Sequence, residues 1–330
     1  MPWFTFDLNN FVVSFLGVLF EGVPFLLLGS IISGFVDVFV SPERMARLLP
    51  GRGIGSVFLS GLLGLIFPMC ECGSVIVIRR FIRKGLPLSA AVTYMLASPI
   101  VSPIVAVSTF AAFQRQGPWV MTGLRLVLGY FLAVGAGLVA RRAKPESILL
   151  PSMLGQTTAR RRSGLTVATA PTQEFSDLAA SSSVSKKLLL AVQSATADFL
   201  DVAFFLIIGA VIASVFNTAV RQEVILPLAA NAPLAIGSMM ILRFLLAICS
   251  TTDAFIAASF ATFPSAAKLA FLVFGPLFDF KLLFLYGVIF RRRLVFLFGI
   301  VMFILVGLIC WRIGIILGPA FEGAPHPLLR

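Results

Sequence analysis

Apolar residues form long runs along the chain, and basic, acidic or turn-forming residues separate these runs. Because about 20 apolar residues cross the hydrocarbon core of a bilayer as an α-helix, such runs predict transmembrane helices. Eight segments are predicted, at about 11–39, 54–78, 86–114, 119–140, 190–216, 234–260, 266–290 and 294–317. The pattern therefore predicts an all-α polytopic membrane protein with about eight transmembrane helices.

Composition supports this fold class. Of the 330 residues, 59% are hydrophobic and only 12% are charged, whereas soluble domains have about twice that charged fraction. The formal net charge of +12 would also suit a nucleic-acid partner, but the basic residues lie at the ends of the apolar runs, where anionic headgroups explain them. We therefore expect the lipid bilayer as partner, no nucleic acid, and a multi-pass location in the cell inner (plasma) membrane.

Two parts of the chain resemble each other. Three stretches match in the same order and at nearly the same offset, and they pair Glu21 with Asp201, Cys70 with Cys249, and Ser102 with Asp279. This pattern predicts two membrane repeats of four segments each, residues 1–140 and 188–330. The intervening residues 141–187 are basic and rich in Ser, Thr and Ala, which is typical of a flexible cytoplasmic linker.

The basic residues also bear on orientation. With the linker cytoplasmic, 12 Lys and Arg of the first half lie inside (four from Arg79 to Lys84 and eight from Arg141 to Lys187) and 4 lie outside, as the positive-inside rule requires. If the chain makes eight simple crossings, the second half has 2 Lys and Arg residues inside and 4 outside, and the 4 outside include Arg291, Arg292 and Arg293. An inverted second repeat would explain this reversal, but it needs an odd number of crossings, so one broken segment would have to be re-entrant. The sequence leaves both arrangements open.

The stretch PMCECGSV, which begins at Pro68, interrupts the second segment. Pro68 cannot donate a backbone hydrogen bond and Gly73 weakens a helix, so we predict a break near the midplane. On an intact helix, Cys70 and Cys72 would lie about 200° apart. An unwound stretch would instead let both thiols face one cavity, to which the repeat adds Cys249.

Three converging sulfurs would suit a thiophilic ligand, because thiolates prefer soft ions such as Cu(I), Zn(II) and trivalent arsenic. Cys70, Cys72 and Cys249 are therefore candidate metal or metalloid ligands, and no cofactor is expected. Glu71 between two of them is costly in lipid unless it faces water or a partner, which favours a functional role. Cys310 is interpreted as a small buried hydrophobe.

Other polar and helix-breaking residues inside the apolar segments are candidates for substrate binding or ion coupling. The candidate substrate-binding residues are Cys70, Glu71, Cys72, Gly73, Ser98, Pro99, Ser102, Cys249, Thr251, Thr252 and Asp253. The candidate ion-coupling residues are Glu21, Asp201, Asp279 and Lys281. Arg125 and Arg243 either pair with these acids or extend to the membrane interface.

Three stretches carry a family resemblance: FPMCECGSVIVIRRFIRKGLPLSAAVTYMLASPIVSPIVA from Phe67, CSTTDAFIAASF from Cys249 and FLVFGPLFDFK from Phe271. The chain resembles the bacterial permease family of ArsP-type organoarsenical exporters and YraQ/YcgR-type predicted permeases, and it is most similar to the YcgR-like branch. The resemblance implies a second membrane subunit and, for arsenical exporters, membrane cysteines as ligands. Here Cys70 and Cys72 match that pattern, although Glu71 departs from the Cys-Ser-Cys-Gly form of other branches.

The function predicted is a permease, not an enzyme, which exports a small thiophilic solute (a metalloid, an organoarsenical or a soft metal ion) through a path between the repeats. The alternative is an ion or proton permease subunit of a two-component membrane complex in which the cysteines are incidental. A metalloprotease is excluded because the only histidine is His326, and no Gly-x-x-x-x-Gly-Lys phosphate loop is present. Cys-x-Cys spacing also differs from the Cys-x-x-Cys of thiol oxidoreductases.

Overall fold

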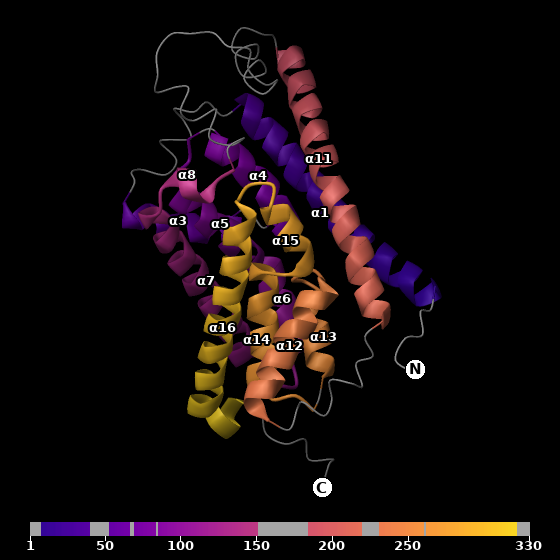
Figure 1. Cartoon of the computed structure of the whole chain (residues 1–330), viewed down its shortest axis with the longest axis vertical. Coiled ribbons are helices and arrows are strands. Elements are labelled where there is room, and N and C mark those ends of the chain that lie inside the picture. The colour runs from indigo at the N-terminus through magenta and orange to yellow at the C-terminus, as the bar shows by residue number, and fades with distance from the viewer. Residues whose placement is uncertain are drawn as a thin grey trace.

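The structure is a computed structural model that describes residues 8–39, 53–66, 69–83, 85–150, 184–219, 231–260 and 262–321. Within these ranges the chain is helical, and one isolated antiparallel bridge joins Leu149 to Phe290. The helices are α1 (Leu8–Phe39), α3 (Ile54–Ile66), α4 (Glu71–Arg83), α5 (Leu88–Val101), α6 (Pro103–Ala112), α7 (Pro118–Arg142), α8 (Pro145–Ile148), α11 (Val184–Ala219), α12 (Ala232–Leu246), α13 (Asp253–Ser259), α14 (Ser265–Leu277), α15 (Phe280–Tyr286) and α16 (Arg292–Phe321) (Figure 1).

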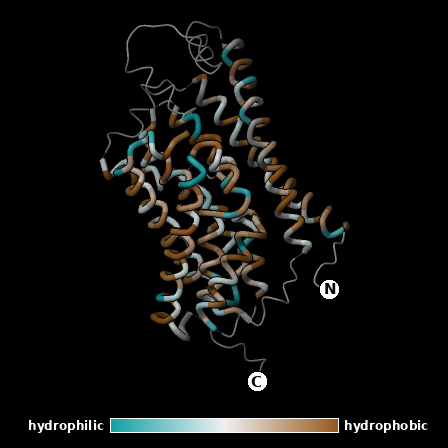
Figure 2. The backbone as a smooth tube through the Cα atoms, viewed as in Figure 1, coloured by the Kyte–Doolittle hydropathy of each residue, from teal (hydrophilic) through white to brown (hydrophobic). Residues whose placement is uncertain are grey.

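Several of these helices are long and apolar enough to cross a bilayer. In the described part of the chain, five candidate spans meet both criteria, namely Leu8–Phe35, Leu88–Ala112, Pro118–Arg142, Ser265–Tyr286 and Arg292–Gly318. Figure 2 shows that hydrophobic residues predominate along the helices. The predicted all-α polytopic membrane fold is therefore confirmed.

Two candidate spans are broken, each next to a polar residue that the sequence singled out as a candidate site residue. Between α5 and α6, Ser102 is extended (φ −57°, ψ 134°) because the following proline disfavours a helical conformation at this residue. Between α14 and α15, Asp279 is the N-cap of α15, and its side chain accepts a hydrogen bond from the backbone N–H of Leu282 at 2.8 Å. The predicted break at Pro68 falls on a residue outside the described ranges.

The helix α3 runs parallel to α5. A Cβ atom added to Gly61 would lie 3.3 Å from a methyl carbon of Thr93, and one added to Gly64 would lie 2.7 Å from the Cα atom of Ser98. Residue numbers therefore increase in the same direction along both helices, so α3 and α5 are parallel. Glycine at position 64 is required, because any side chain there would meet the backbone of α5.

The helix α4 runs in the opposite direction along α5. Near its start, the Ser74 hydroxyl donates to the carbonyl of Met95 at 3.3 Å. Near its end, the carbonyl of Phe81 accepts from the N–H of Leu86, just before α5 begins, at 2.9 Å. The two helices α3 and α4 are therefore a hairpin whose open end lies where α5 begins.

The helices α12 and α13 form a second hairpin. At its tip, Nε of Arg243 on α12 lies 3.7 Å from Oδ2 of Asp253 on α13. From there α13 runs to Ala258, whose carbonyl accepts from the Gln116 side chain, between α6 and α7, at 3.2 Å. The same glutamine accepts from Lys268 near the start of α14 at 2.8 Å. The hairpin thus opens where α6 ends and α7 begins.

The two hairpins enter the bundle from opposite ends. We call the end where α7 finishes and α11 starts the linker end; α3 and α4 open there, whereas α12 and α13 open at the other end (Figure 1). The second and sixth predicted segments are thus hairpins rather than straight crossings. Within the described residues, the five candidate spans belong to α1, α5 with α6, α7, α14 with α15, and α16, and the long helix α11 lies beside α1 (Figure 1).

The loop before α16 lies at the linker end. The N–H of Arg291 donates to the carbonyl of Ile148 at 3.1 Å, and the N–H of Leu150 donates to that of Ile289 at 3.0 Å. Arg291 to Arg293 are therefore on the same side as the end of α7, which corrects the placement that eight simple crossings gave them. Residues 145–150 of the predicted linker pack on the fold here, and residues 151–183 lie outside the described ranges.

The long helices α1 and α11 cross as an antiparallel pair at one side of the bundle (Figure 1). Two glycines of this pair, Gly29 on α1 and Gly209 on α11, allow close contacts with the first hairpin and with the broken span. A Cβ atom on Gly29 would lie 2.9 Å from the Cα atom of Gly73 on α4, and one on Gly209 would lie 3.2 Å from the Cα atom of Lys281 on α15. The two halves share one order of elements, a long helix, a hairpin, a broken span and a long helix, and the repeat itself stays a prediction.

Candidate functional site

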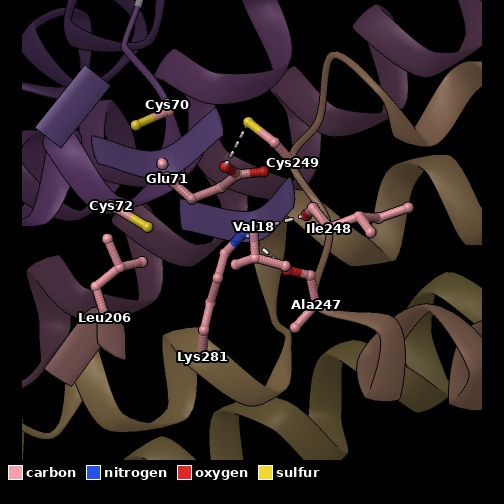
Figure 3. A pocket seen from close by; sticks show the side chains of 10 residues that line it. Val18, Cys70, Glu71, Cys72, Leu206, Ala247, Ile248, Cys249 and Lys281 are labelled. Carbon is pink, nitrogen blue, oxygen red and sulfur yellow. Dashed lines mark hydrogen bonds between the residues drawn. The ribbon is translucent and has the colours of Figure 1, made fainter. Parts of the chain in front are cut away.

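A pocket lies where the tips of the two hairpins meet. Residues of α1, α4, α11 and α15 line it together with both tips. The lining residues are Val18, Gly22, Cys70, Glu71, Cys72, Leu206, Ala247, Ile248, Cys249 and Lys281 (Figure 3). The pocket has room for about one water molecule. The pocket is therefore narrow in this conformation.

The first hairpin tip is shaped by the start of α4. The backbone N–H of Gly73 donates to Sγ of Cys70 at 3.3 Å, and the N–H of Ser74 donates to the carbonyl of Cys70 at 3.0 Å. Cys70 is thus the N-cap of α4: its carbonyl accepts the first i→i−4 bond of the helix, and its thiol satisfies one of the N–H groups that a helix start leaves without intrahelical partners. Its thiol has a local structural role, and Figure 3 shows the sulfur directed away from Cys249.

The second hairpin tip is shaped by the end of α12. Ala247 adopts the left-handed conformation (φ 46°), which turns the chain out of the helix. The carbonyl of Ile248 then accepts from Nη2 of Arg243 at 2.9 Å and from Nζ of Lys281 at 3.1 Å. The carbonyl of Ala247 accepts from the same ammonium at 3.2 Å. Backbone oxygens freed by the break are therefore satisfied by two buried cations.

Glu71 connects the two tips. Its Oε2 atom accepts from the thiol of Cys249 at 3.7 Å, a contact that Figure 3 marks with a dashed line. Its Oε1 atom lies 4.0 Å from Nη2 of Arg243 and has no hydrogen-bond partner in the described part of the chain. Since Glu71 is only 1% exposed, this carboxylate is buried with one oxygen incompletely satisfied.

Arg243 lies at the centre of a buried charge network. Besides Glu71, its guanidinium lies 3.7 Å from a carboxylate oxygen of Asp253 and 3.6 Å from one of Asp279. The helix α14 approaches it closely, because an added Cβ atom on Gly275 would collide with the guanidinium. A glycine is therefore needed at position 275 to admit the arginine.

Arg125 extends the network to α7. Its Nη2 atom lies 3.0 Å from the Asp253 carboxylate and donates to the carbonyl of Ser250 at 2.9 Å. Its Nη1 atom donates to the hydroxyl of Thr109 on α6 at 2.8 Å. Both arginines are fully buried, so the alternative in which they extend to the membrane interface is wrong, and the alternative in which they pair with acids is confirmed.

The network is balanced in formal charge. Three carboxylates and three cations belong to it, all at most 4% exposed, so the sum is zero: Glu71, Asp253 and Asp279 against Arg125, Arg243 and Lys281. Charges this deep are retained in membrane proteins when they are paired and when they line a substrate or ion path. Two of the candidate ion-coupling residues, Asp279 and Lys281, are partners in it, with 3.5 Å between Oδ2 and Nζ.

The structure brings together only part of the predicted site. Cys70, Cys72 and Cys249 line one pocket, yet no group of three His, Cys, Asp or Glu side chains in the described ranges is placed to hold a metal ion. The predicted metal ligands are therefore not a formed metal site here, because Cys70 caps α4 and Cys249 donates to Glu71.

Other predicted residues lie away from the pocket lining. Ser98, Pro99 and Ser102 are buried around the break between α5 and α6. Thr251 is half-buried and Thr252 exposed at the second tip, beside the buried Asp253. Glu21 and Asp201 are in α1 and α11, and their side chains lie outside what the structure describes. Sequence reasoning missed the lining residues Val18, Gly22, Leu206, Ala247 and Ile248, which carry no chemical signal in an apolar run.

A separate ion pair joins α4 to α11 toward the linker end. Arg80 Nε lies 2.8 Å from Asp198 Oδ2, and Arg80 Nη2 donates to Asp198 Oδ1 at 2.9 Å. The hydroxyl of Ser33 on α1 donates to the same carboxylate at 2.8 Å. This bidentate contact ties the α1 and α11 pair to the first hairpin.

These features define a polytopic membrane protein with a buried polar site between the tips of two hairpins. A family model described as a predicted permease, ArsP_1, matches residues 7–314, and the chain belongs to this family. The chain is 35% identical over 268 residues to the UPF0718 protein YcgR of Bacillus subtilis (strain 168), covering 81% of this chain and 84% of that protein.

A second relative comes from Streptococcus mutans serotype c. It is described as a putative two-component membrane permease complex subunit, and it is 33% identical over 268 residues, covering 81% of this chain and 82% of the relative. No solved structure matches the chain. Family membership and the apolar helices identify a multi-pass protein of the bacterial cell membrane.

Proposed function

We propose that this permease exports a small thiophilic solute, a metalloid, organoarsenical or soft metal ion, through the pocket between the hairpin tips. The observation that carries the proposal is the meeting of three thiols from both halves of the chain, Cys70, Cys72 and Cys249, in one buried pocket beside Glu71. Sulfur ligands favour soft ions, and a neighbouring carboxylate can accept the protons that thiols release on binding.

Transport requires the pocket to open. With room for about one water molecule, the present conformation admits no organoarsenical. The two hairpins reach the pocket from opposite ends of the bundle, so moving one tip opens the site to one side and moving the other opens it to the other side. We infer a secondary permease in which α3–α4 and α12–α13 alternate as gates.

This arrangement also supports an inverted repeat. Each half would contribute three crossings and one re-entrant hairpin, which is the odd number that inversion requires. The linker end carries the basic residues Arg141, Arg142, Lys144 and Arg291 to Arg293, so we assign it to the cytoplasm. A second membrane subunit is part of the proposal, supported by the description of the streptococcal relative.

The test is accumulation in everted membrane vesicles of trivalent methylarsenite, with zinc and copper(I) as comparators. We expect Cys72→Ser and Cys249→Ser to lose accumulation of the transported solute. Cys310→Ser is the matched control, since Cys310 is fully buried in α16 and does not line the pocket. Equal accumulation in all four proteins, or none above empty vesicles, would refute the thiol-dependent export.

The second candidate function is an ion or proton permease in which the cysteines are incidental. The observation in its favour is Glu71, whose buried carboxylate has one oxygen without a hydrogen bond inside a network of six charges. For this function, Glu71→Gln abolishes ion-driven pH changes in reconstituted vesicles while Cys72→Ser leaves them intact. The opposite pattern of losses would reject it.

A further inference from the structure

Oxygen atoms surround the ammonium group of Lys281 in the way that they surround a bound cation. It is only 4% exposed, and lysine is almost never buried this far without partners. Its ammonium contacts the carbonyls of Ala247 and Ile248 at 3.2 and 3.1 Å, and Oδ2 of Asp279 at 3.5 Å. Three oxygens from two different segments thus surround one positive charge.

The backbone geometry explains why oxygens are available at this place. The helix α12 ends at Leu246, and the left-handed Ala247 directs the following chain away from the helix axis. The last carbonyls of a helix have no intrahelical partner, and they carry the negative end of the helix dipole. Broken helices of secondary transporters use such carbonyls to bind monovalent cations.

We propose that these oxygens form a monovalent-cation site that Lys281 fills with its own ammonium group, so that the protein carries its cation covalently. The charge count fits, because the network without Lys281 has three carboxylates and two guanidinium groups and lacks one positive charge. The proposal goes beyond the transported solute and stands whether or not the cysteines bind it.

The distances define the class of cation that could replace the ammonium. The two carbonyl contacts, at 3.2 and 3.1 Å, are ordinary N–H···O separations for an ammonium group, and the Asp279 carboxylate is an ion-pair partner at 3.5 Å. Mg²⁺ and Ca²⁺ need oxygens at about 2.0–2.1 Å and 2.3–2.6 Å. A site of this size and charge therefore takes ammonium, methylammonium or potassium rather than a divalent ion.

The experiment uses purified full-length Lys281→Ala protein in detergent. Its thermal unfolding is measured in chloride salts of potassium, ammonium, methylammonium and choline at constant ionic strength. We expect the wild-type midpoint to be the same in potassium and choline. We expect the variant to unfold at a lower temperature in choline and to recover, saturably, as potassium or ammonium is added.

Lys268→Ala is the matched control. Lys268 is also 4% exposed, but its ammonium donates to Gln116 at the end of the bundle opposite the linker end. It does not line the pocket. This variant should unfold at a lower temperature than the wild type with no preference among the salts. An equal gain from potassium in both variants would mean that the cation acts elsewhere and would overturn the proposal.

A folding failure is also informative. If Lys281→Ala is monodisperse only when purified in potassium or ammonium, the proposal is supported; if it is misfolded in every salt, or folded with equal midpoints in potassium and choline, it is overturned. The double variant Lys281→Ala with Asp279→Asn removes one negative charge and one oxygen ligand. It should fold without a cation and show no response, and a retained response would refute the site.

Discussion

The ion pair between Arg80 and Asp198 permits a quantitative prediction outside the candidate site. The two side chains are 6% and 5% exposed, and both guanidinium contacts are shorter than 3.0 Å. Removing one member of a buried pair leaves the other as an uncompensated charge, which costs about 3–5 kcal/mol. We therefore expect Arg80→Met to lower the free energy of unfolding by this amount.

The double variant separates the energy of the ion pair from other effects of the two substitutions on stability. In Arg80→Met with Asp198→Asn, the asparagine oxygen still accepts from the Ser33 hydroxyl, and no charge is left buried. We expect the double variant to be more stable than either single variant, with a coupling energy of about 3 kcal/mol, at the upper end for directly contacting residues.

The assay is reversible unfolding in mixed micelles at increasing mole fractions of sodium dodecyl sulfate, followed by tryptophan fluorescence. All four proteins of the cycle are measured under identical conditions. If the losses of the two single variants simply add in the double variant, Arg80 and Asp198 are not energetically paired. The assignment of this contact as the tie between α11 and the first hairpin would then be refuted.

Three further predictions follow from the packing, the topology and the charges. Gly29→Ala should lower the free energy of unfolding by about 1–3 kcal/mol, because its methyl group would meet the Gly73 backbone at 2.9 Å. Gly17→Ala should not destabilise the protein, because no atom lies within 4 Å of the added Cβ and alanine favours the helix; equal unfolding midpoints of the two variants would contradict the contact of Gly29. In intact cells, a membrane-impermeant maleimide should label both Asn231→Cys and Ser259→Cys, and it should label Ser147→Cys only after permeabilisation. Protection of position 259 from labelling would indicate a straight crossing instead of a hairpin. Wild-type flux in vesicles should be the same in potassium and choline buffers, and dependence on potassium would contradict a covalently carried cation.

Much of the fold could be predicted from the sequence because apolar length and helix breakers are local signals. The break at Ser102 follows from the proline after it, and the break at Asp279 follows from a residue suited to an N-cap. The direction that the chain takes after a break could not be predicted in the same way. The apolar stretch 234–260 has the same composition whether it crosses the membrane or folds back at Ala247.

The candidate site was predictable where residues are chemically unusual for a membrane. Glu71, Asp253 and Asp279 could be identified because each is an acid within an apolar segment. Their partners could not be assigned, because Arg243 reaches acids on three different elements and only the tertiary structure decides which. The carbonyls around Lys281 carry no sequence signal at all, since every residue has one.

The balanced charge of the buried network has an electrical consequence. A group that moves through the membrane potential gains or loses about 2.3 kcal/mol per elementary charge per 100 mV. With three carboxylates and three cations, the empty network has a formal valence of zero, so its displacement as a unit does no net work against the field. Binding a charged solute, or gaining or losing one proton, changes this valence by one or more. The membrane potential would then drive the occupied protein in one direction and leave the empty protein free to return.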